Sequence, residues 1–288
     1  MQNQFCDGYS VGFGTFDEMR SYHEELSRES LWLRCAVREL RVMPVTSESA
    51  PWYGYAPCVS EDAVADTAQN LGLAVHVYGE AYPLRQTAWK SLLDRAKLSG
   101  SVLPKLSRKK LADILNECFK LHSSDALALV RCEKVSALHS GDEADYSVLP
   151  IGELLSTVSA KLNERFPGRV FISGYTDHAL TGAEWTMPGQ RDELLKTYEA
   201  MLTARGKGAM AARLMPGIRF MTSDTGVSSA KVSAMLMGAQ YPIHIGGCVE
   251  VEHRHKSTVV DFELVMGQLF AQFTDSVAKL QKLPDIHL

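Results

Sequence analysis

The apolar pattern of this chain switches between strand-like and helical spacing without a regular alternation of the two. Residues 126–132 and 135–139 predict two short strands around a turn at Glu133 and Lys134. Strands joined by so short a connection pair antiparallel, whereas parallel neighbours need a crossover of a dozen or more residues. The order of elements therefore favours the α+β class over a doubly wound parallel sheet.

Other segments extend this pattern. Period-two spacing predicts a strand within 31–45 and further strands at 169–173, 178–185, 218–222, 230–237 and 247–253. Helical spacing predicts helices at 84–98, 107–121, 150–166, 191–205 and 258–280, the last opened by a capping-box pattern at Thr258 and Asp261. We expect an antiparallel twisted sheet with a long C-terminal helix and a helical N-terminal portion.

The domain organisation follows from the same segments. Residues 1–30 are polar and glycine-rich at first, which fits a flexible arm or a docked helix. Residues 31–122 form a strand plus a helical portion, and residues 123–288 form a sheet-rich portion that ends in the long helix. One domain over all 288 residues is the alternative.

Composition narrows the class of protein. The net charge of −4 argues against coating duplex DNA by bulk charge but leaves room for a local basic groove. Six scattered cysteines without a CxxC pair predict reduced thiols. Because no export signal and no membrane-length apolar run is present, we expect a cytoplasmic protein.

Familiar catalytic motifs are missing from the sequence. It has no Gly-x-Ser-x-Gly elbow and no phosphate-binding Gly-x4-Gly-Lys-Ser/Thr loop. Ser223–Asp224–Thr225–Gly226 contains the Asp-Thr-Gly of aspartic proteases, but that chemistry needs two facing copies and the chain has one. A turn between strands, with Asp224 bonding the local backbone and Gly226 at positive φ, accounts for the same residues. We expect no enzyme activity and no cofactor.

A metal site is the remaining catalytic alternative. His244, Cys248, His253 and His255 lie close in sequence and carry the atoms that zinc prefers. Their spacing matches no structural-zinc pattern, and a polar strand end explains them equally. We therefore predict no metal and keep these four residues as an alternative.

Basic residues indicate a binding surface. Arg108, Lys109 and Lys110 open a predicted helix, where backbone N–H groups already favour phosphate. Arg205, Lys207 and Arg213 lie in a glycine-loosened loop without an acidic residue. Further cations lie on or beside the predicted C-terminal strands, namely Arg219, Lys231, Arg254 and Lys256. A solvated first turn and a plain connector are the alternatives for the first two groups.

Aromatic residues offer stacking for bases. Trp52 and Tyr53 lie in a loop bounded by Pro51 and Pro57, and Tyr175 lies between two predicted strands. Stacking on an aromatic ring contributes about 1–3 kcal/mol per base. Half-buried packing is the alternative for each of these rings.

The C-terminal half also resembles a known group. The segment 218–226 with its Ser-Asp-Thr-Gly turn, and the Glu252–His253 step before the terminal helix, are similar to an uncharacterised family of phage- and plasmid-like proteins. The resemblance covers about residues 84–283. The family's function is not established, so the resemblance implies a mobile genetic element and no particular activity.

A second resemblance concerns the step from Tyr146 and Leu149 into the following helix. This step is similar to one in the RecT- and Erf-type single-strand annealing proteins. That resemblance implies a twisted antiparallel sheet with a long helix, a homo-oligomer, and a basic groove for single-stranded DNA.

Two hypotheses follow. The first is a non-catalytic single-stranded-DNA-binding or annealing protein of a phage or plasmid, with the basic residues on phosphates and Trp52, Tyr53 or Tyr175 on bases. The second is a protein-interaction factor, either anti-defence or assembly, that binds a protein partner. Salt dependence separates them, because phosphate neutralisation gives a steep salt slope.

Overall fold

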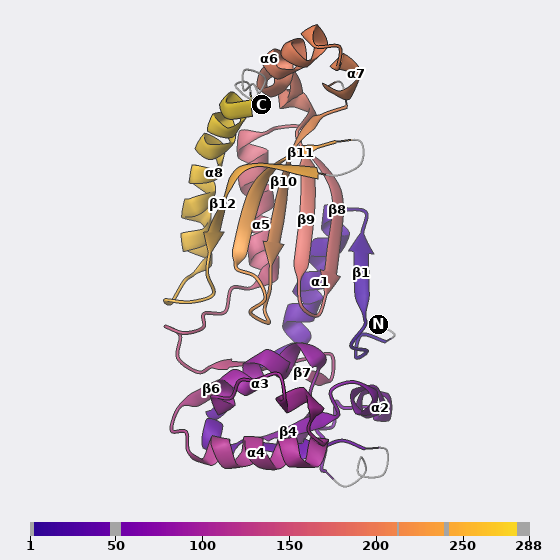
Figure 1. The fold of residues 1–288 in the computed structure, drawn as a ribbon, viewed down its shortest axis with the longest axis vertical. Helices are drawn as coiled ribbons and strands as arrows, with labels where there is room; N and C mark the ends of the chain where they lie inside the picture. The colour runs from indigo at the N-terminus through magenta and orange to yellow at the C-terminus, as the bar shows by residue number, and fades with distance from the viewer. Residues whose placement is uncertain (1–2, 47–52, 212, 239–241, 281–288) are drawn as a thin grey trace.

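The protein has two lobes stacked along its long axis (Figure 1). The computed structural model describes residues 3–46, 53–211, 213–238 and 242–280. Two separate apolar cores define the lobes. We call residues 10–29 together with 147–280 the large lobe, and residues 31–140 the small lobe.

The large lobe is built on one six-stranded antiparallel sheet. Its strands, in spatial order, are β1 (Ser10–Phe13), β8 (Val170–Asp177), β9 (Thr181–Thr186), β10 (Met215–Thr222), β11 (Ala230–Met237) and β12 (Pro242–Val251). Ala183 and Trp185 of β9 and Phe220 of β10 point into the core, whereas Glu184 and Arg219 between them point the other way.

Among the described residues, helices cover one face of this sheet and not the other. The helices α1 (Phe16–Glu29), α5 (Ile151–Arg165) and α8 (Val259–Leu280) contribute Met19, Leu155 and Phe262 to the same core as Trp185. The other face of the described sheet carries no helix and is turned toward the viewer in Figure 1. The helix α6 (Arg191–Ala204) and the short helix α7 (Gly208–Ala211) lie at the end of the molecule far from the small lobe (Figure 1).

The small lobe contains two three-stranded antiparallel sheets. One is formed by β2 (Leu31–Ala36), β6 (Asp125–Arg131) and β7 (Lys134–Ser140), the other by β3 (Arg41–Pro44), β4 (Leu73–Val77) and β5 (Glu80–Pro83). A parallel bridge between Leu84 and Val135 links them. The helices α2 (Glu61–Gln69), α3 (Trp89–Ala96) and α4 (Arg108–Lys120) complete the lobe, with 3₁₀ turns at Val37–Glu39, Gln86–Ala88 and Leu103–Lys105. Another 3₁₀ turn, Pro188–Gln190, precedes α6 in the large lobe.

The protein is α+β, but the layout expected from the sequence, one twisted antiparallel sheet with a long C-terminal helix and a helical N-terminal portion, is wrong. The described residues form three antiparallel sheets. The β3-β4-β5 sheet lies wholly within the 31–122 portion that was expected to be mainly helical, and the β2-β6-β7 sheet takes β2 from that portion and its other two strands from beyond residue 122. The strand β4 shows why the pattern failed. Four of its five residues are buried, so it lacks the apolar–polar alternation that marks a strand with one face in water.

The two cores also show where the N-terminal residues belong. Residues 10–29, for which the sequence left a flexible arm or a docked helix open, form β1 and α1 of the large lobe. The strands β6 and β7 belong to the small-lobe core, so the expected boundary near residue 122 does not coincide with the division between cores. No helix of the described residues combines the length and apolar character that a membrane span requires.

A buried ionic cluster fastens the N-terminal segment to both lobes. The Arg85 side chain is fully buried and donates to the carbonyl of Cys6 at 3.1 Å. The buried Lys134 ammonium donates to Asp7 at 3.0 Å. On the large lobe, His178 Nε2 donates to the same Cys6 carbonyl at 2.9 Å. The segment therefore bridges the lobes by satisfying two buried cations.

Candidate functional site

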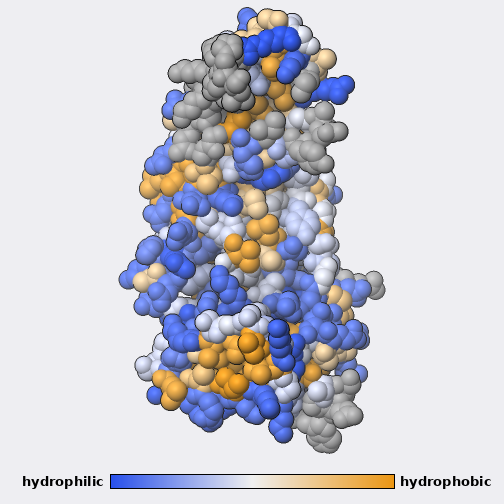
Figure 2. Space-filling view, in the orientation of Figure 1, coloured by the Kyte–Doolittle hydropathy of each residue, from blue (hydrophilic) through white to orange (hydrophobic). Residues whose placement is uncertain are grey.

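A polar cleft of about 820 Å³ lies where the two lobes meet. Its volume falls within the range of about 300–1,000 Å³ that small-molecule and cofactor sites occupy. Figure 2 shows hydrophilic residues gathered around this junction. Residues of α3, the end of β7, the 226–229 turn and the segment after β12 line it, so both lobes form its walls.

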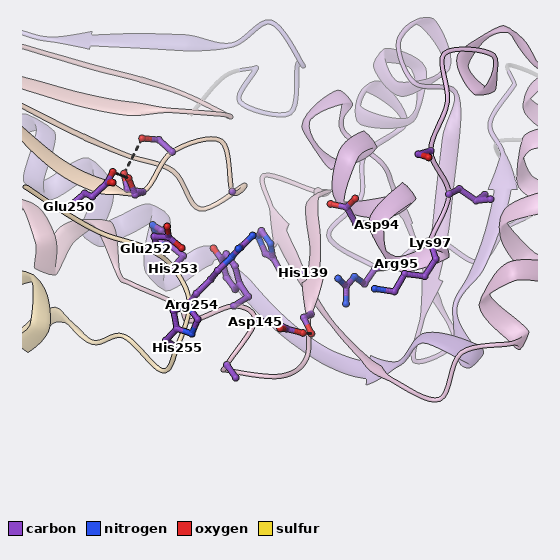
Figure 3. A pocket seen from close by; sticks show the side chains of 18 residues that line it. Asp94, Arg95, Lys97, His139, Asp145, Glu250, Glu252, His253, Arg254 and His255 are labelled. Atoms are coloured by element: carbon purple, nitrogen blue, oxygen red, sulfur yellow. Dashed lines mark hydrogen bonds between the residues drawn. The ribbon is translucent and has the colours of Figure 1, made fainter. Parts of the chain in front are cut away.

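The small-lobe wall is the C-terminal end of α3. The helix ends at Ala96, and Lys97 closes it with a left-handed backbone at φ 53°. This cap places Arg95 and Lys97 side by side at the cleft, and Figure 3 shows both side chains extending toward the large lobe. Cations are favoured at a helix C-terminus because they complement its negative dipole end.

The large-lobe wall is the tight turn between β12 and α8. His255 and Lys256 have left-handed backbones at φ 60° and 61°. Their N–H groups donate to the carbonyls of Ala144 and Glu143 at 2.9 and 3.1 Å, which holds the turn against the segment between the lobes. Arg254 consequently projects into the cleft toward His139 (Figure 3).

A stack of rings forms the floor. The rings of His139 and Tyr146 lie parallel, with centroids 3.5 Å apart and an interplanar angle of 4°, and His253 stacks on the other side of Tyr146 at 5.7 Å. Burial lowers the pKa of His139 to about 4 and also lowers the pKa of His253. Burial likewise raises the pKa of the Tyr146 phenol. At neutral pH the floor is therefore uncharged.

Asp224 connects this floor to both lobes. Its carbonyl accepts hydrogen bonds from His139 Nε2 at 2.7 Å and from the Tyr146 hydroxyl at 2.9 Å. Its carboxylate forms a buried ion pair with Arg131 at 2.5 Å. The expected turn is present, with Gly226 at φ 77°, but Ser223 Oγ rather than Asp224 accepts from the local backbone N–H groups. Asp224 thus joins the lobes, and its position gives no support for protease chemistry.

Three cations of the cleft stand without partners. Within the residues that the structure describes, the side chains of Arg95, Lys97 and Arg254 form no hydrogen bond and no ion pair. The Arg95 Nε atom is buried in the wall without an acceptor. Four carboxylates also line the cleft, from Asp94, Asp145, Glu250 and Glu252. The cleft therefore offers unpaired positive charge on both walls among acidic neighbours.

The basic residues predicted from the sequence do not come together. Arg108, Lys109 and Lys110 open α4 in the small lobe, whereas Arg205, Lys207 and Arg213 lie beside α6 and α7 at the opposite end (Figure 1). The structure therefore places the two groups at opposite ends of the molecule, so they do not share one groove. Adjacency in the sequence shows only that each group is locally rich in cations.

The four cations near the C-terminal strands divide differently. Arg219 is paired with Glu184 through Nε at 2.7 Å, so its charge is already neutralised. Lys231 lies on the helix-free face of the sheet. Arg254 enters the cleft, and Lys256 lies in a neighbouring pocket with Arg34. Of this group, only Arg254 belongs to the cleft.

The aromatic residues also have different positions. Trp52 lies outside the described residues. The Tyr53 ring is half-buried, and its hydroxyl donates to the Pro44 carbonyl at 2.7 Å. Tyr175 is exposed on the helix-free face of the large sheet.

The possible zinc ligands are not assembled. His253 is buried, with Nδ1 3.3 Å from the Ser147 carbonyl and Nε2 3.3 Å from Thr222 Oγ1. His255 lines the cleft, whereas His244 and Cys248 are exposed on β12. Among the described residues, no group of three or more His, Cys, Asp or Glu side chains could hold a metal ion.

Sequence reasoning missed Arg95, Lys97 and His139. One signal for the first two was available: basic residues at the end of an amphipathic helix, directly before the Ser99–Gly100 linker. No local pattern marks His139, because its role comes from packing against Tyr146 and Asp224, which belong to other segments.

Comparison with known protein families, with curated proteins and with solved structures found no match. The resemblances to phage- and plasmid-like proteins and to single-strand annealing proteins therefore stay predictions. What the chain does must be inferred from the cleft itself.

Proposed function

We propose that the protein is a non-catalytic single-stranded-DNA-binding protein whose binding site is the cleft between the lobes. The observation that carries the proposal is the set of three unpaired cations, Arg95, Lys97 and Arg254, on both walls of a polar cleft. An unpaired cation is available to a phosphate group, and cations from two walls suit a chain of phosphates that passes between them.

A single strand fits the cleft better than a duplex. The walls carry carboxylates beside the cations, and the whole chain has a net charge of −4. Such a surface does not attract the dense charge of a duplex. A single strand is thinner and less densely charged, and it can place individual phosphates at individual cations. On this proposal the protein acts in the DNA metabolism of a phage or plasmid in the host cytoplasm, which is also what the resemblances imply.

The test is a fluorescence-anisotropy titration with a labelled single strand at two salt concentrations. The triple variant Arg95→Ala/Lys97→Ala/Arg254→Ala is expected to bind at least tenfold more weakly at low salt. In a plot of log affinity against log salt concentration, each lost phosphate contact should make the slope less steep by about 0.7 for a single strand. The matched control is Lys109→Ala/Lys110→Ala, which removes exposed cations of α4 and is expected to bind as wild type.

Each result has a definite meaning. Weaker binding of the control with an unchanged triple variant would move the site to α4 and refute the cleft proposal. Absence of salt-dependent binding by folded wild-type protein would remove DNA binding altogether. Circular dichroism of each variant establishes that the comparison concerns folded protein.

The second candidate is binding of a protein partner, and one observation favours it. Val260 and Leu264 lie one turn apart on α8 and are 62% and 70% exposed. Apolar side chains on a free helix face are suited to a protein interface. If this face binds a protein, the variant Val260→Ser/Leu264→Ser should no longer self-associate in sedimentation equilibrium or no longer recover a cellular partner. Any DNA binding should be unchanged.

A further inference from the structure

One cross-strand row of residues spans the helix-free face of the large sheet. The strand registers place one residue of each strand directly opposite the next, in the order Gly12, Tyr175, Gly182, Met221, Lys231 and Glu250. Their sequence neighbours Gly174, Ala183 and Val232 face the core instead. Because side chains alternate along each strand, the whole row projects from the face without helices (Figure 1).

Tyr175 is an open platform within this row. Its side chain is 45% exposed, and both cross-strand neighbours, Gly12 and Gly182, have no side chain to cover the ring. The hydroxyl donates to Asp177 at 2.8 Å, which fixes the ring over the sheet. A fixed, uncovered aromatic ring on a sheet is what a nucleobase needs for stacking.

Lys231 supplies an unpaired cation to the same row. Within the described residues its side chain forms no ion pair, in contrast to Arg219 in the next row, which is bound by Glu184. Neighbouring strands lie about 4.8 Å apart, so the three strand steps from Lys231 to Tyr175 span about 14 Å. This distance places a phosphate contact and a base contact on one short stretch of strand.

The row ends at the cleft. Glu250, its last member, lines the cleft together with Ser229, whose hydroxyl donates to the Glu250 carboxylate at 2.7 Å. Lys231 is the direct neighbour of Glu250 on the adjacent strand. A strand held by the three cleft cations therefore has a direct exit onto this face of the sheet.

We propose that single-stranded DNA leaving the cleft crosses the sheet along this row, with a phosphate at Lys231 and a base stacked on Tyr175. The inference rests on the proposed function and extends it by a second contact region. It makes affinity depend on strand length, because only a strand long enough to reach Tyr175 gains the stacking contact.

The test measures affinity by competition anisotropy with oligonucleotides of about 4, 8 and 16 nucleotides, the span of known single-strand site sizes. Tyr175→Ala is expected to weaken binding of the longest strand by roughly 5- to 150-fold, the range of one lost stack, and to leave the shortest unchanged. Tyr175→Phe keeps the ring and is expected to bind as wild type. Tyr78→Ala is the matched control, since Tyr78 is a 68% exposed tyrosine of the small lobe.

The outcomes separate this inference from the proposed function. If Tyr175→Ala binds every length as wild type while the cleft triple variant loses affinity, the path over the sheet is wrong and the cleft remains. Equal weakening at every length would also overturn the path, because Tyr175 would then belong to the primary contact. If wild type binds no strand, both proposals fail.

Discussion

The rings of His139 and Tyr146 lie parallel with centroids 3.5 Å apart, and both donate a hydrogen bond to the carbonyl of Asp224. His139 ends a strand of the small lobe, whereas Asp224 belongs to the turn between β10 and β11 of the large lobe. The stack therefore forms the floor of the cleft and also joins the two lobes. Its stability should decide whether the cleft keeps its shape.

Acid should weaken this joint. The pKa of His139 is lowered to about 4 by burial, from an ordinary value of 6.5. Between these pH values the unfolded chain binds a proton that the folded protein does not. The contribution of His139 to the free energy of unfolding is therefore complete above about pH 6.5. It falls as the pH drops toward 4, by up to about 1.4 kcal/mol per pH unit for one histidine. Urea denaturation at about pH 7.5, 6 and 5 measures the slope.

A variant assigns part of that slope to His139. His139→Gln retains an N–H donor for the Asp224 carbonyl but does not titrate in this range. We expect a slope smaller by up to about 1.4 kcal/mol per pH unit. His23, His178 and His253, whose pKa values burial also lowers, supply the remainder. If the pH dependence of the free energy of unfolding is the same in His139→Gln as in wild type, the lowered pKa assigned to His139 is wrong.

The ion pair between Arg131 and Asp224 should be sensitive to loss of one partner. Both side chains are almost completely buried, and Asp224 Oδ1 already lacks a hydrogen-bond partner among the described residues. Arg131→Met is expected to lower the free energy of unfolding by about 3–5 kcal/mol, because it leaves a buried carboxylate unpaired. Arg131→Met/Asp224→Asn should recover part of this loss. A double variant no more stable than the single one would contradict this explanation.

The N-terminal clamp should contribute to stability in the same way. Asp7 accepts from Lys134 Nζ at 3.0 Å and from the backbone N–H of Gln86 at 2.7 Å. Asp7→Ala leaves the buried Lys134 with Asp66 alone, and we expect a loss of about 3 kcal/mol in urea denaturation. Asp17→Ala is the control, because Asp17 forms only an exposed pair with Arg20 and should cost less than about 1 kcal/mol. Equal effects of the two substitutions would argue against a structural clamp.

The sequence predicted those elements whose pattern is local. Helical spacing predicted a helix at 150–166, and its apolar positions Ile151, Leu154, Leu155 and Val158 are all buried in α5. The β3-β4-β5 sheet of the small lobe was less accessible to such reasoning, since its strands have only four or five residues each. Segments so short carry little periodicity, and tertiary contacts decide their conformation.

The cleft could not be predicted for a related reason. Arg95 and Lys97 come from the end of a small-lobe helix, whereas Arg254 comes from a turn near the end of the chain. Only the packing of the lobes brings them together. Arg108, Lys109 and Lys110 were more conspicuous because they adjoin in sequence, yet they open α4 far from the junction, where Lys109 and Lys110 are exposed.

The two faces of the large sheet should respond differently to an added methyl group. A Cβ at Gly174 would lie 2.5 Å from Met19 Sδ in the core, whereas one at Gly182 would meet only the Phe220 carbonyl at 3.7 Å. Gly174→Ala is therefore expected to cost about 1–3 kcal/mol in urea denaturation, and Gly182→Ala less than about 1 kcal/mol. A large loss at Gly182 would contradict the assignment of that face as uncovered.

Removal of acidic charge from the cleft should strengthen DNA binding. Asp94 and Glu252 line the cleft beside the unpaired cations, and a bound phosphate is repelled by both carboxylates. Asp94→Asn/Glu252→Gln is expected to tighten single-strand binding roughly 2- to 10-fold at low salt, with a smaller gain at high salt because screening weakens both interactions. Asp113→Asn changes an exposed carboxylate of α4 and should leave affinity unchanged. Because a gain of affinity does not arise from damage to the fold, equal affinities of the double variant and wild type in anisotropy titrations would count directly against phosphate binding in the cleft.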